Sequence, residues 1–512
     1  MKKRNKKAIT VDRRSTGHEY LALFAGIAVT AAVYLPSLGN KLVADSWVFM
    51  VPRSFFSTFG YFFRTMLPPE HNAFWLRPIP MFTYWLDTVL WPGTAWGPHL
   101  QNVLFHLINI WLVWLIVRYI CRGHGESRNS GGASLALFAA CIVYGLHPLT
   151  VGSVAWVAAR FDVMSVTFGL AGLYLWFRWS DGRYGNRYVA WCLLLLLLSL
   201  FSKEQGIVFI AVCFLASMMQ WAFYPDRRKR AIIGMSALVI AVLVYTVLRV
   251  AAFSGLGGYM EARHGLSVKP PVFYLVALLY PYMNVIKNPS ITVTFVLAAC
   301  LLVICGIYEL KHAATASGGV RRLFIVCAAV LCLFGLATNA PNPGMTFERI
   351  MGHAESRFAL NAIAGMALLV GALARVASGS KPGHVLAVVC ITVWGVTAAW
   401  RTDVQIQSWA NAGMIADAII EDTIRQAPDP PPNSRLLFFD IPRSNEQWAY
   451  IYGIGLKEAL QLKYGRTDID IVRFPTKIDQ RNFVPDRDYA FRYDRTTGGL
   501  ERLFKQSKPT AP

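Results

Sequence analysis

The sequence predicts an α-helical protein that crosses a membrane many times and ends in a small soluble α/β domain. Three observations support this fold class. Of the 512 residues, 55% are hydrophobic and only 15% are charged, whereas soluble domains are usually about 25% charged. The apolar residues form runs close to the length of about 20 residues that spans a bilayer as a helix. Basic residues cluster between these runs in alternate gaps, as expected for a multi-pass topology.

About eleven apolar runs are candidate membrane spans. The run at 188–201 is shorter than the rest, which suggests a tilted or broken helix. In chain order the runs are residues 20–38, 99–120, 133–149, 161–177, 188–201, 205–223, 231–253, 289–310, 323–340, 358–375 and 384–400.

The basic residues predict the orientation of the chain. Residues 1–19 are rich in Lys and Arg, and the run after them is too long for a cleaved signal peptide. We therefore expect the N-terminus in the cytoplasm of a bacterium, with the spans in its inner (cell) membrane. An odd number of spans then places the C-terminal residues on the periplasmic or extracellular side.

Two outer segments are predicted to have structure of their own. Residues 39–98 form a long first outer loop, whose amphipathic stretches at 55–63 and 79–91 suggest helices in the membrane interface. Residues 401–512 form the soluble tail, after a transmembrane domain over 20–400. Strands are expected at 436–439 and 469–474, and a helix at 448–464 ended by Gly465. We interpret the polar residues of the tail, such as Asp440 and Arg443, as structural.

Composition excludes some classes of protein. The net charge of +21 comes in short clusters between apolar runs, whereas nucleic-acid binding needs basic residues on one folded face. All nine cysteines lie in or beside apolar runs, so a disulfide framework is not expected.

Ionisable residues at the outer helix ends are the informative ones, because charges near a membrane interior are costly unless they have a role. One carboxylate among several cations fits transfer of a group from an anionic lipid. Arg and Lys can hold a phosphate as it departs, and a carboxylate can take a proton from an acceptor hydroxyl. The outer residues are Asp45, Arg77, His99, Asn102, His106, His147, Arg160, Asp162, Lys203, Glu204, His353, Glu355 and Arg357.

Each of these residues also has a simpler interpretation. Asp45 could cap the helix that follows it. The arginines could anchor lipid head groups, and Lys203 with Glu204 could be a local ion pair. The histidines are more often hydrogen-bonding residues at helix ends than metal ligands, and the sequence leaves the need for a divalent metal open.

Short motifs in a fixed order resemble a known family. The sequence resembles the transmembrane and tetratricopeptide-repeat O-mannosyltransferases of the GT-C glycosyltransferase superfamily over about residues 20–375, although the repeats are absent. The motifs are Asp45, Leu76-Arg-Pro-Ile79, His99-Leu-Gln-Asn102 with Leu104-Phe-His106, His147-Pro148, Val154-Ala-Trp156, Arg160-Phe-Asp162, Ser202-Lys-Glu-Gln-Gly206 and Glu355-Ser-Arg-Phe358.

The resemblance implies a polyprenyl-phosphate-linked sugar donor and a catalytic acidic residue in the first outer loop, a position that Asp45 matches. Related protein O-mannosyltransferases usually have an acidic pair there, whereas this chain has Asp45 and Ser46. Glu70 or Asp87 could supply a second carboxylate. The relatives also often have an acidic residue where this chain has Gly152.

The sequence thus predicts an inverting GT-C glycosyltransferase whose acceptor is a glycan, a lipid-linked glycan or a protein. Asp45 is the expected general base, and no nucleic-acid partner is expected. Three alternatives remain open at this point: a ligase or polymerase of lipid-linked oligosaccharides, a flippase for lipid-linked sugars, and a non-catalytic scaffold. The expected phosphate ligands are Arg77, Lys203 and Arg357, with Arg160 and His147 as further candidates, and His99, Asn102, His106, Asp162, Glu204, His353 and Glu355 line the site.

Overall fold

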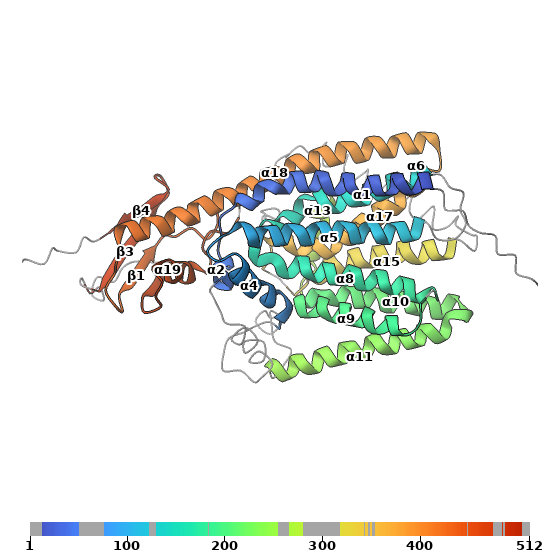
Figure 1. Ribbon diagram of the computed structural model, residues 1–512, viewed down its shortest axis with the longest axis horizontal. Helices are drawn as coiled ribbons and strands as arrows, with labels where there is room; N and C mark the ends of the chain where they lie inside the picture. Colours follow the sequence, from blue (N-terminus) through green and yellow to red (C-terminus); the bar gives the residue numbers. More distant parts are fainter. Residues whose placement is uncertain are drawn as a thin grey trace, which may run out of the picture.

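The fold was analysed in a computed structural model. It describes residues 13–50, 76–121, 130–182, 184–253, 266–279, 318–341, 344–346, 349–350, 354–447, 449–474, 484 and 487–503. The described part is a bundle of long helices, to one end of which a small α/β domain is joined (Figure 1).

Most of the helices follow the predicted apolar runs, but Lys269–Leu279 forms a helix that no run predicted, and among the described residues fewer helices than the expected eleven have the length and hydropathy of a span. In the described residues, six helices are long and apolar enough to cross a membrane, or seven if a bent pair counts as one span. The predicted run at 289–310 lies outside these residues. The longer helices are α1 (Arg13–Tyr34), α5 (Trp96–Cys121), α6 (Ser130–Leu146), α8 (Arg160–Ser180), α9 (Arg187–Ser202), α10 (Ile207–Phe223), α11 (Arg228–Phe253), α13 (Lys269–Leu279), α15 (Gly318–Ala337), α17 (Leu360–Ala377) and α18 (Lys381–Gln426).

The bend in this pair of helices occurs at a proline. Helix α6 ends at Leu146, and the chain continues through η2 (Pro148–Thr150) into α7 (Val151–Val154), with a bend of 49°. Pro148 has no amide hydrogen, and its ring disfavours helical backbone at the residue before it. His147 instead adopts extended backbone and caps η2. Then η3 (Val157–Ala159) leads the chain into α8.

Short helices cover the end of the bundle nearest the α/β domain. After α1 come η1 (Leu35–Gly39) and α2 (Ser46–Met50), and α4 (Pro78–Leu90) packs against α2, α5, α8 and α9. This confirms the amphipathic helix expected at 79–91, while the stretch at 55–63 lies outside the described residues. Two further turns, η4 (Glu204–Gly206) and η6 (Glu355–Ala359), stand at the same end, and η5 (Pro225–Arg227) joins α10 to α11 at the other.

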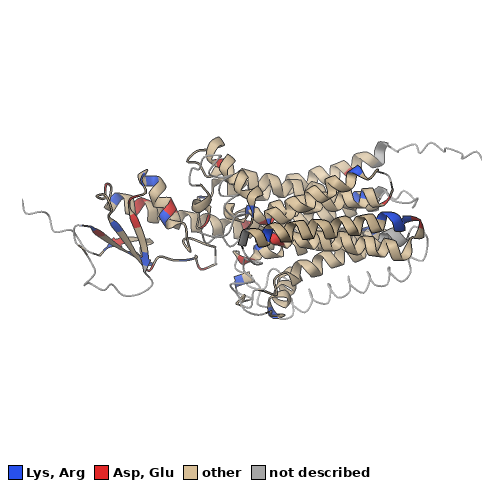
Figure 2. Cartoon of the chain, turned by 90° about the horizontal axis from the view of Figure 1, so that it is seen from below, with Lys and Arg blue, Asp and Glu red and all other residues tan. Residues whose placement is uncertain are grey.

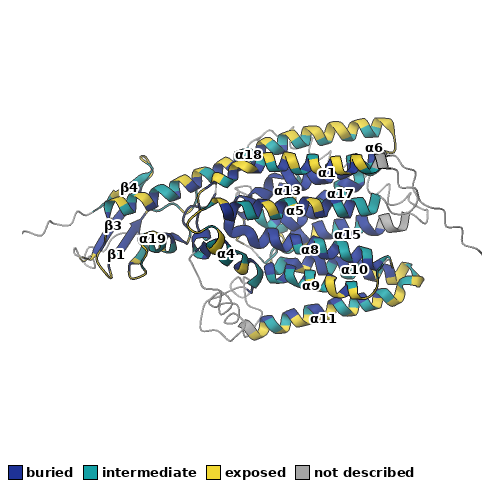
Figure 3. Cartoon of the chain, viewed as in Figure 1, coloured by how far each residue is buried: buried dark blue, intermediate teal, exposed yellow. Residues whose placement is uncertain are grey.

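The last helix is longer than its apolar run. The run at 384–400 predicts a span that stops at the membrane surface. Instead, α18 is one unbroken helix of 46 residues that extends into the tail. Its apolar half is exposed on the side of the bundle (Figure 3), as expected for a lipid-facing surface. Its second half buries Trp409 and Ile419 against the tail and the end of the bundle.

The tail contains a four-stranded sheet in the order β2-β1-β3-β4. Strand β1 (Arg435–Phe439) runs parallel to β2 (Asp470–Phe474) and to β3 (Asp488–Asp494), and β4 (Gly499–Arg502) is antiparallel to β3. Both predicted strands are present. The predicted helix at 448–464 is shorter, because α19 (Leu456–Tyr464) begins only after Gly455, whose φ of 92° is incompatible with a helix interior.

Charged residues avoid the middle of the bundle and gather at its two ends and in the tail (Figure 2). At the end away from the tail, Arg118 pairs with Glu19 at 2.8 Å and Arg227 with Asp181 at 2.9 Å. The candidate site residues lie at the other end, beside α2, α4 and the tail.

Candidate functional site

Asp45 lies at the end of the bundle that faces the tail, directly before α2. Its main-chain carbonyl accepts a hydrogen bond from the Val48 amide at 3.0 Å, which is the first turn of that helix. Within the described residues its carboxylate bonds no amide of α2, so a capping role does not account for this side chain. Burial raises the pKa of Asp45 above its ordinary value, and the nearby Arg357 guanidinium opposes this shift.

Glu355 organises the arginines closest to Asp45. Its Oε1 accepts a hydrogen bond from Arg349 at 2.9 Å and another from the Tyr450 hydroxyl at 2.6 Å. Its Oε2 lies 3.8 Å from the Arg357 guanidinium. The carboxylate is buried, so it holds both arginines in a fixed position.

The Arg357 guanidinium lies between two aromatic rings. It stands 4.5 Å from the centre of the Trp156 ring and 4.6 Å from the centre of the Phe358 ring. Trp156 in turn contacts Trp409 of α18, with ring centres 5.7 Å apart. Contact with aromatic rings restricts the movement of a guanidinium by cation–π interaction.

Lys203 forms a buried ion pair with Asp162, and its ammonium group also lies 4.3 Å from the centre of the Phe358 ring. Burial lowers the pKa of Lys203 to about 8. Asp162 raises it, and the positive charges of Arg77 and Arg357 lower it. These three cations are therefore close enough to repel one another, although they come from three separate segments of the chain.

Glu204 completes the arrangement. It accepts a hydrogen bond from Arg77 at 2.7 Å and lies 3.4 Å from Arg249, near the end of α11. Sequence analysis did not select Arg249. The signal was present, because an arginine inside a long apolar run is rarely there without a partner or a role.

We call Arg77, Lys203, Arg249, Arg349 and Arg357 the cation cluster. Among the described residues these five cations form ion pairs with the carboxylates of Asp162, Glu204 and Glu355, and Arg357 also acts on Asp45. The cluster is largely buried, and such a concentration of Arg and Lys side chains is suited to bind a phosphate.

Arg160 lies outside the cation cluster and has its own partners. It is fully buried, pairs with Asp87 at 2.6 Å and donates to Asn102 at 2.8 Å and to the Pro98 carbonyl at 3.0 Å. Asn102 in turn donates to the carbonyl of Trp156. The contacts of Arg160 thus connect α8 to α4 and α5, and through Asn102 they support the main chain at Trp156. Asp87 is not placed to act as a second catalytic carboxylate, and Glu70 lies outside the described residues.

The predicted histidines are buried within the helices. His147 donates to the Leu278 carbonyl at 3.0 Å and accepts from the Leu149 amide at 3.2 Å, so both ring nitrogens are occupied. His106 bonds the Gly145 carbonyl at 3.0 Å, and His99 is buried in the first turns of α5. These contacts fit helix packing rather than phosphate binding. His353 lies outside the described residues.

Within the ranges given above, no group of three or more His, Cys, Asp or Glu side chains is placed to hold a metal ion.

The tail reaches the site directly. The Tyr450 ring packs against Trp156, with ring centres 5.2 Å apart, and its hydroxyl binds Glu355. The next residue, Ile451, accepts a hydrogen bond from the Ala44 amide at 2.8 Å. One extended piece of the tail therefore contacts both the Asp45 loop and the partner of Arg357. Sequence analysis missed Tyr450, because no local pattern shows that the tail folds back onto the bundle.

Comparison with known proteins gives distant relatives. No family model matches the chain. It is 28% identical over 146 residues to the protein O-mannosyl-transferase F38B6.6 of Caenorhabditis elegans, and 28% identical over 171 residues to the protein O-mannosyl-transferase Tmtc3 of Drosophila melanogaster. The alignments cover 28% and 30% of this chain, but only 19% and 18% of those proteins.

The fold has a counterpart among solved structures. The crystal structure of ArnT from Cupriavidus metallidurans bound to undecaprenyl phosphate matches 92% of this chain and 93% of its own, with a TM-score of 0.50 and 12% sequence identity. The chain is therefore a multi-pass membrane protein with a fold similar to that of ArnT and a distant sequence similarity to O-mannosyltransferases.

Proposed function

We propose that this protein is a membrane glycosyltransferase that moves one sugar from a polyprenyl-phosphate donor to an acceptor hydroxyl. The observation that carries the proposal is the cation cluster beside Asp45. Its concentration of positive charge suits a phosphate, and Arg357 contacts Glu355 and also acts on Asp45, which forms no ion pair within the described residues.

The donor class follows from the same residues. A polyprenyl phosphate brings its lipid from within the membrane and its phosphate to the membrane surface, which suits a cation cluster at one end of the helical bundle. Trp156 supports this placement, because its buried indole N–H has no hydrogen-bond partner among the described residues. An oxygen of a bound donor would satisfy it. The bound undecaprenyl phosphate of the ArnT structure is consistent with this choice.

The proposed reaction is a single displacement with inversion. Asp45 removes the proton of the acceptor hydroxyl, whose oxygen attacks the anomeric carbon of the donor sugar. The bond between that carbon and the phosphate oxygen breaks, and polyprenyl phosphate leaves with the bonding electrons. Arg357, Lys203 and Arg77 stabilise the charge that grows on this phosphate in the transition state.

The raised pKa of Asp45 suits the role of a base. A carboxylate that burial makes more basic accepts a proton more readily, provided that it is still ionised at the working pH. The nearby Arg357 keeps the group ionised by opposing the effect of burial. We further propose that the N-terminus faces the cytoplasm and that the tail lies on the periplasmic or extracellular side, in accordance with the distribution of basic residues.

The test is incubation of the purified protein in lipid nanodiscs with a panel of radiolabelled polyprenyl-phosphate sugars and a bacterial envelope extract as the source of acceptor hydroxyls. The wild type should release free polyprenyl phosphate from one donor. Asp45→Asn should bind that donor equally well and release none, because the amide keeps the shape of the side chain but cannot take a proton. Turnover by Asp45→Asn near that of the wild type would remove Asp45 from the mechanism. Consumption of a diphosphate donor alone would favour an oligosaccharide ligase instead.

A further inference from the structure

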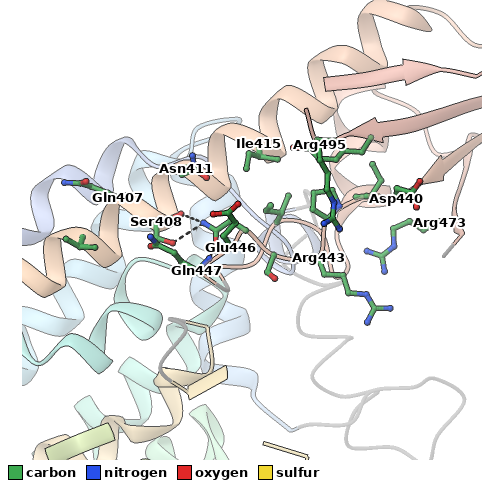
Figure 4. Close-up of a pocket in the computed structure, with 17 residues that line it drawn as sticks. Gln407, Ser408, Asn411, Ile415, Asp440, Arg443, Glu446, Gln447, Arg473 and Arg495 are labelled. Atoms are coloured by element: carbon green, nitrogen blue, oxygen red, sulfur yellow. Dashed lines mark hydrogen bonds between the residues drawn. The ribbon is translucent and has the colours of Figure 1, made fainter. Parts of the chain in front are cut away.

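A large polar groove lies between α18 and the tail, outside the apolar part of the bundle. Its volume is about 1400 Å³, which exceeds the range of about 300 to 1,000 Å³ typical of small-molecule sites. One wall is the second half of α18, with Gln407, Ser408 and Asn411, and the other is the segment that follows β1 (Figure 4). We call it the tail groove.

Three guanidinium groups line the tail groove, those of Arg443, Arg473 and Arg495. Within the described part of the chain none of the three forms an ion pair with a carboxylate. Burial, and after it the neighbouring Arg443, lowers the pKa of Arg473. Two like charges are therefore held near each other without a carboxylate to balance them, an arrangement that an anion would stabilise.

The carboxylates of the tail groove do not cancel this charge. Two of them line it, Asp440 and Glu446, against three guanidinium groups, and both are exposed, as are Arg443 and Arg495. Asp440 lies 3.5 Å from Arg492, which is not a lining residue, so its charge is already shared. The remaining polar lining is uncharged and includes side-chain amides and the Ser408 hydroxyl. Amides and hydroxyls of this kind are suitable partners for the hydroxyl groups of a sugar.

The inner end of the tail groove adjoins the candidate active site. Ile451 lines it, and the carbonyl of the same residue accepts the hydrogen bond from Ala44, next to Asp45. Ser408 also lines it, and the following residue, Trp409, packs on Trp156 beside Arg357. The tail groove is thus connected to the Asp45 loop through Ile451.

We propose that the tail groove binds the acceptor, and that this acceptor is an anionic saccharide bearing carboxylate or phosphate groups. The inference rests on the proposed function, since it names the acceptor of that reaction. Its grounds are the size of the groove, its three guanidiniums without carboxylate partners, its uncharged hydrogen-bonding groups and its contact with the Asp45 loop. Arg443 and Arg495 bind the anionic groups, and the α18 wall binds sugar hydroxyls.

The test measures saccharide binding directly, with the full-length protein in nanodiscs. The probes are trigalacturonate, maltose 1-phosphate and neutral maltotriose, with inorganic phosphate as the simple anion. The variant Arg443→Gln/Arg495→Gln removes two positive charges, and each glutamine side chain is only somewhat shorter than the arginine it replaces. The matched control is Arg425→Gln, which changes an exposed arginine of α18 outside the tail groove.

We expect the wild type to bind trigalacturonate or maltose 1-phosphate more tightly than maltotriose or inorganic phosphate. The preferred anionic probe tells whether carboxylate or phosphate is recognised. The double variant should lose at least about tenfold in affinity for that probe, since each charge-assisted hydrogen bond contributes at least about a factor of ten. Arg425→Gln should bind as the wild type does.

Two results would overturn the inference: equal binding of neutral and anionic saccharides, or unchanged affinity in the double variant. Release of polyprenyl phosphate by the wild type in the presence of the envelope extract tests the proposed function separately. Donor release together with failed saccharide binding would reject only the tail groove as the acceptor site. Saccharide binding without any donor release would reject the transferase.

Discussion

The hydroxyl of Tyr450 in the tail donates a hydrogen bond of 2.6 Å to Glu355 at the end of the helical bundle. Glu355 is also the partner of Arg349 and Arg357, so a residue of the tail helps to hold a proposed phosphate ligand. Burial and the Glu355 carboxylate raise the pKa of Tyr450 to about 12, which keeps the hydroxyl protonated as a donor at physiological pH. The tail is thus connected to the site by a side-chain hydrogen bond as well as by the main chain.

Tyr450→Phe should lower the rate of transfer without unfolding the protein. Loss of a hydrogen bond to a charged acceptor costs about 1.5 to 3 kcal/mol, so we expect kcat/KM for the donor to fall by about tenfold or more. Steady-state kinetics with the labelled donor would measure this. The control is Tyr464→Phe, which removes another tail hydroxyl, bonded to the Ala427 carbonyl at 2.7 Å. Equal kinetics in both variants would contradict a positioning role for Tyr450.

Gly455 is required by the close approach of the tail to the Asp45 loop. Its φ is 92°, and a Cβ atom there would come within 2.1 Å of the Ala44 carbonyl oxygen. Gly455→Ala should therefore push the two segments apart, lower the melting temperature and reduce transfer. Gly465→Ala is the matched control, because Gly465 also has a positive φ of 67° but no atom within 4 Å of the added Cβ.

The control should cost only the backbone strain of about 1 to 2 kcal/mol, with full activity in the protein that remains folded. Melting temperatures and specific activities of the two variants give the comparison. If Gly455→Ala proves no more harmful than Gly465→Ala, the contact between tail and loop is not needed.

The sequence predicted most of the helices, because hydropathy is a local property of the chain, and it drew attention to polar residues that the structure places at the end of the bundle facing the tail. It did not predict which residues are partners. Tyr450 and Glu355 lie 95 positions apart, and Arg77 and Glu204 lie 127 apart. Such pairs form through the packing of helices and cannot be read from spacing. The continuation of α18 beyond its apolar run was missed for the same reason, since its second half is stabilised by packing.

A plot of kcat/KM against pH should have an acid limb and an alkaline limb. Asp45 acts as a base only when ionised, so kcat/KM should rise with pH through its pKa, which burial raises above the ordinary value. Lys203 has its pKa lowered to about 8 by burial, with Arg77 and Arg357 adding to the shift and Asp162 opposing it. Above that pH the ammonium group loses its charge, and phosphate binding should weaken.

Lys203→Arg separates the two limbs. Arginine keeps its charge at every accessible pH, so the alkaline limb should disappear while the acid limb stays. The measurement is kcat/KM for the donor between pH 5 and about 10 in both proteins, with melting temperatures to confirm folding. An alkaline limb that is unchanged in a folded Lys203→Arg protein would assign that limb to another group.

Arg160 should prove to be a stabilising residue rather than a phosphate ligand. It is fully buried with Asp87, and its guanidinium also serves Asn102 and a main-chain carbonyl. Removal of one partner from a buried ion pair leaves the other charge uncompensated, which costs about 3 to 5 kcal/mol. Arg160→Met should therefore destabilise the protein by roughly that amount.

The matched control is Lys41→Met, which breaks a 2.8 Å pair with Asp417 at an exposed position. A surface pair contributes about 0 to 1 kcal/mol, so this change should be small. In Arg160→Met/Asp87→Leu no charge is left unpaired, and stability should largely return. The decisive measurement is donor affinity in this double variant. Affinity near that of the wild type in a folded protein is the expected result, because the phosphate is bound by the cation cluster. A large loss of affinity at restored stability would return Arg160 to the set of phosphate ligands.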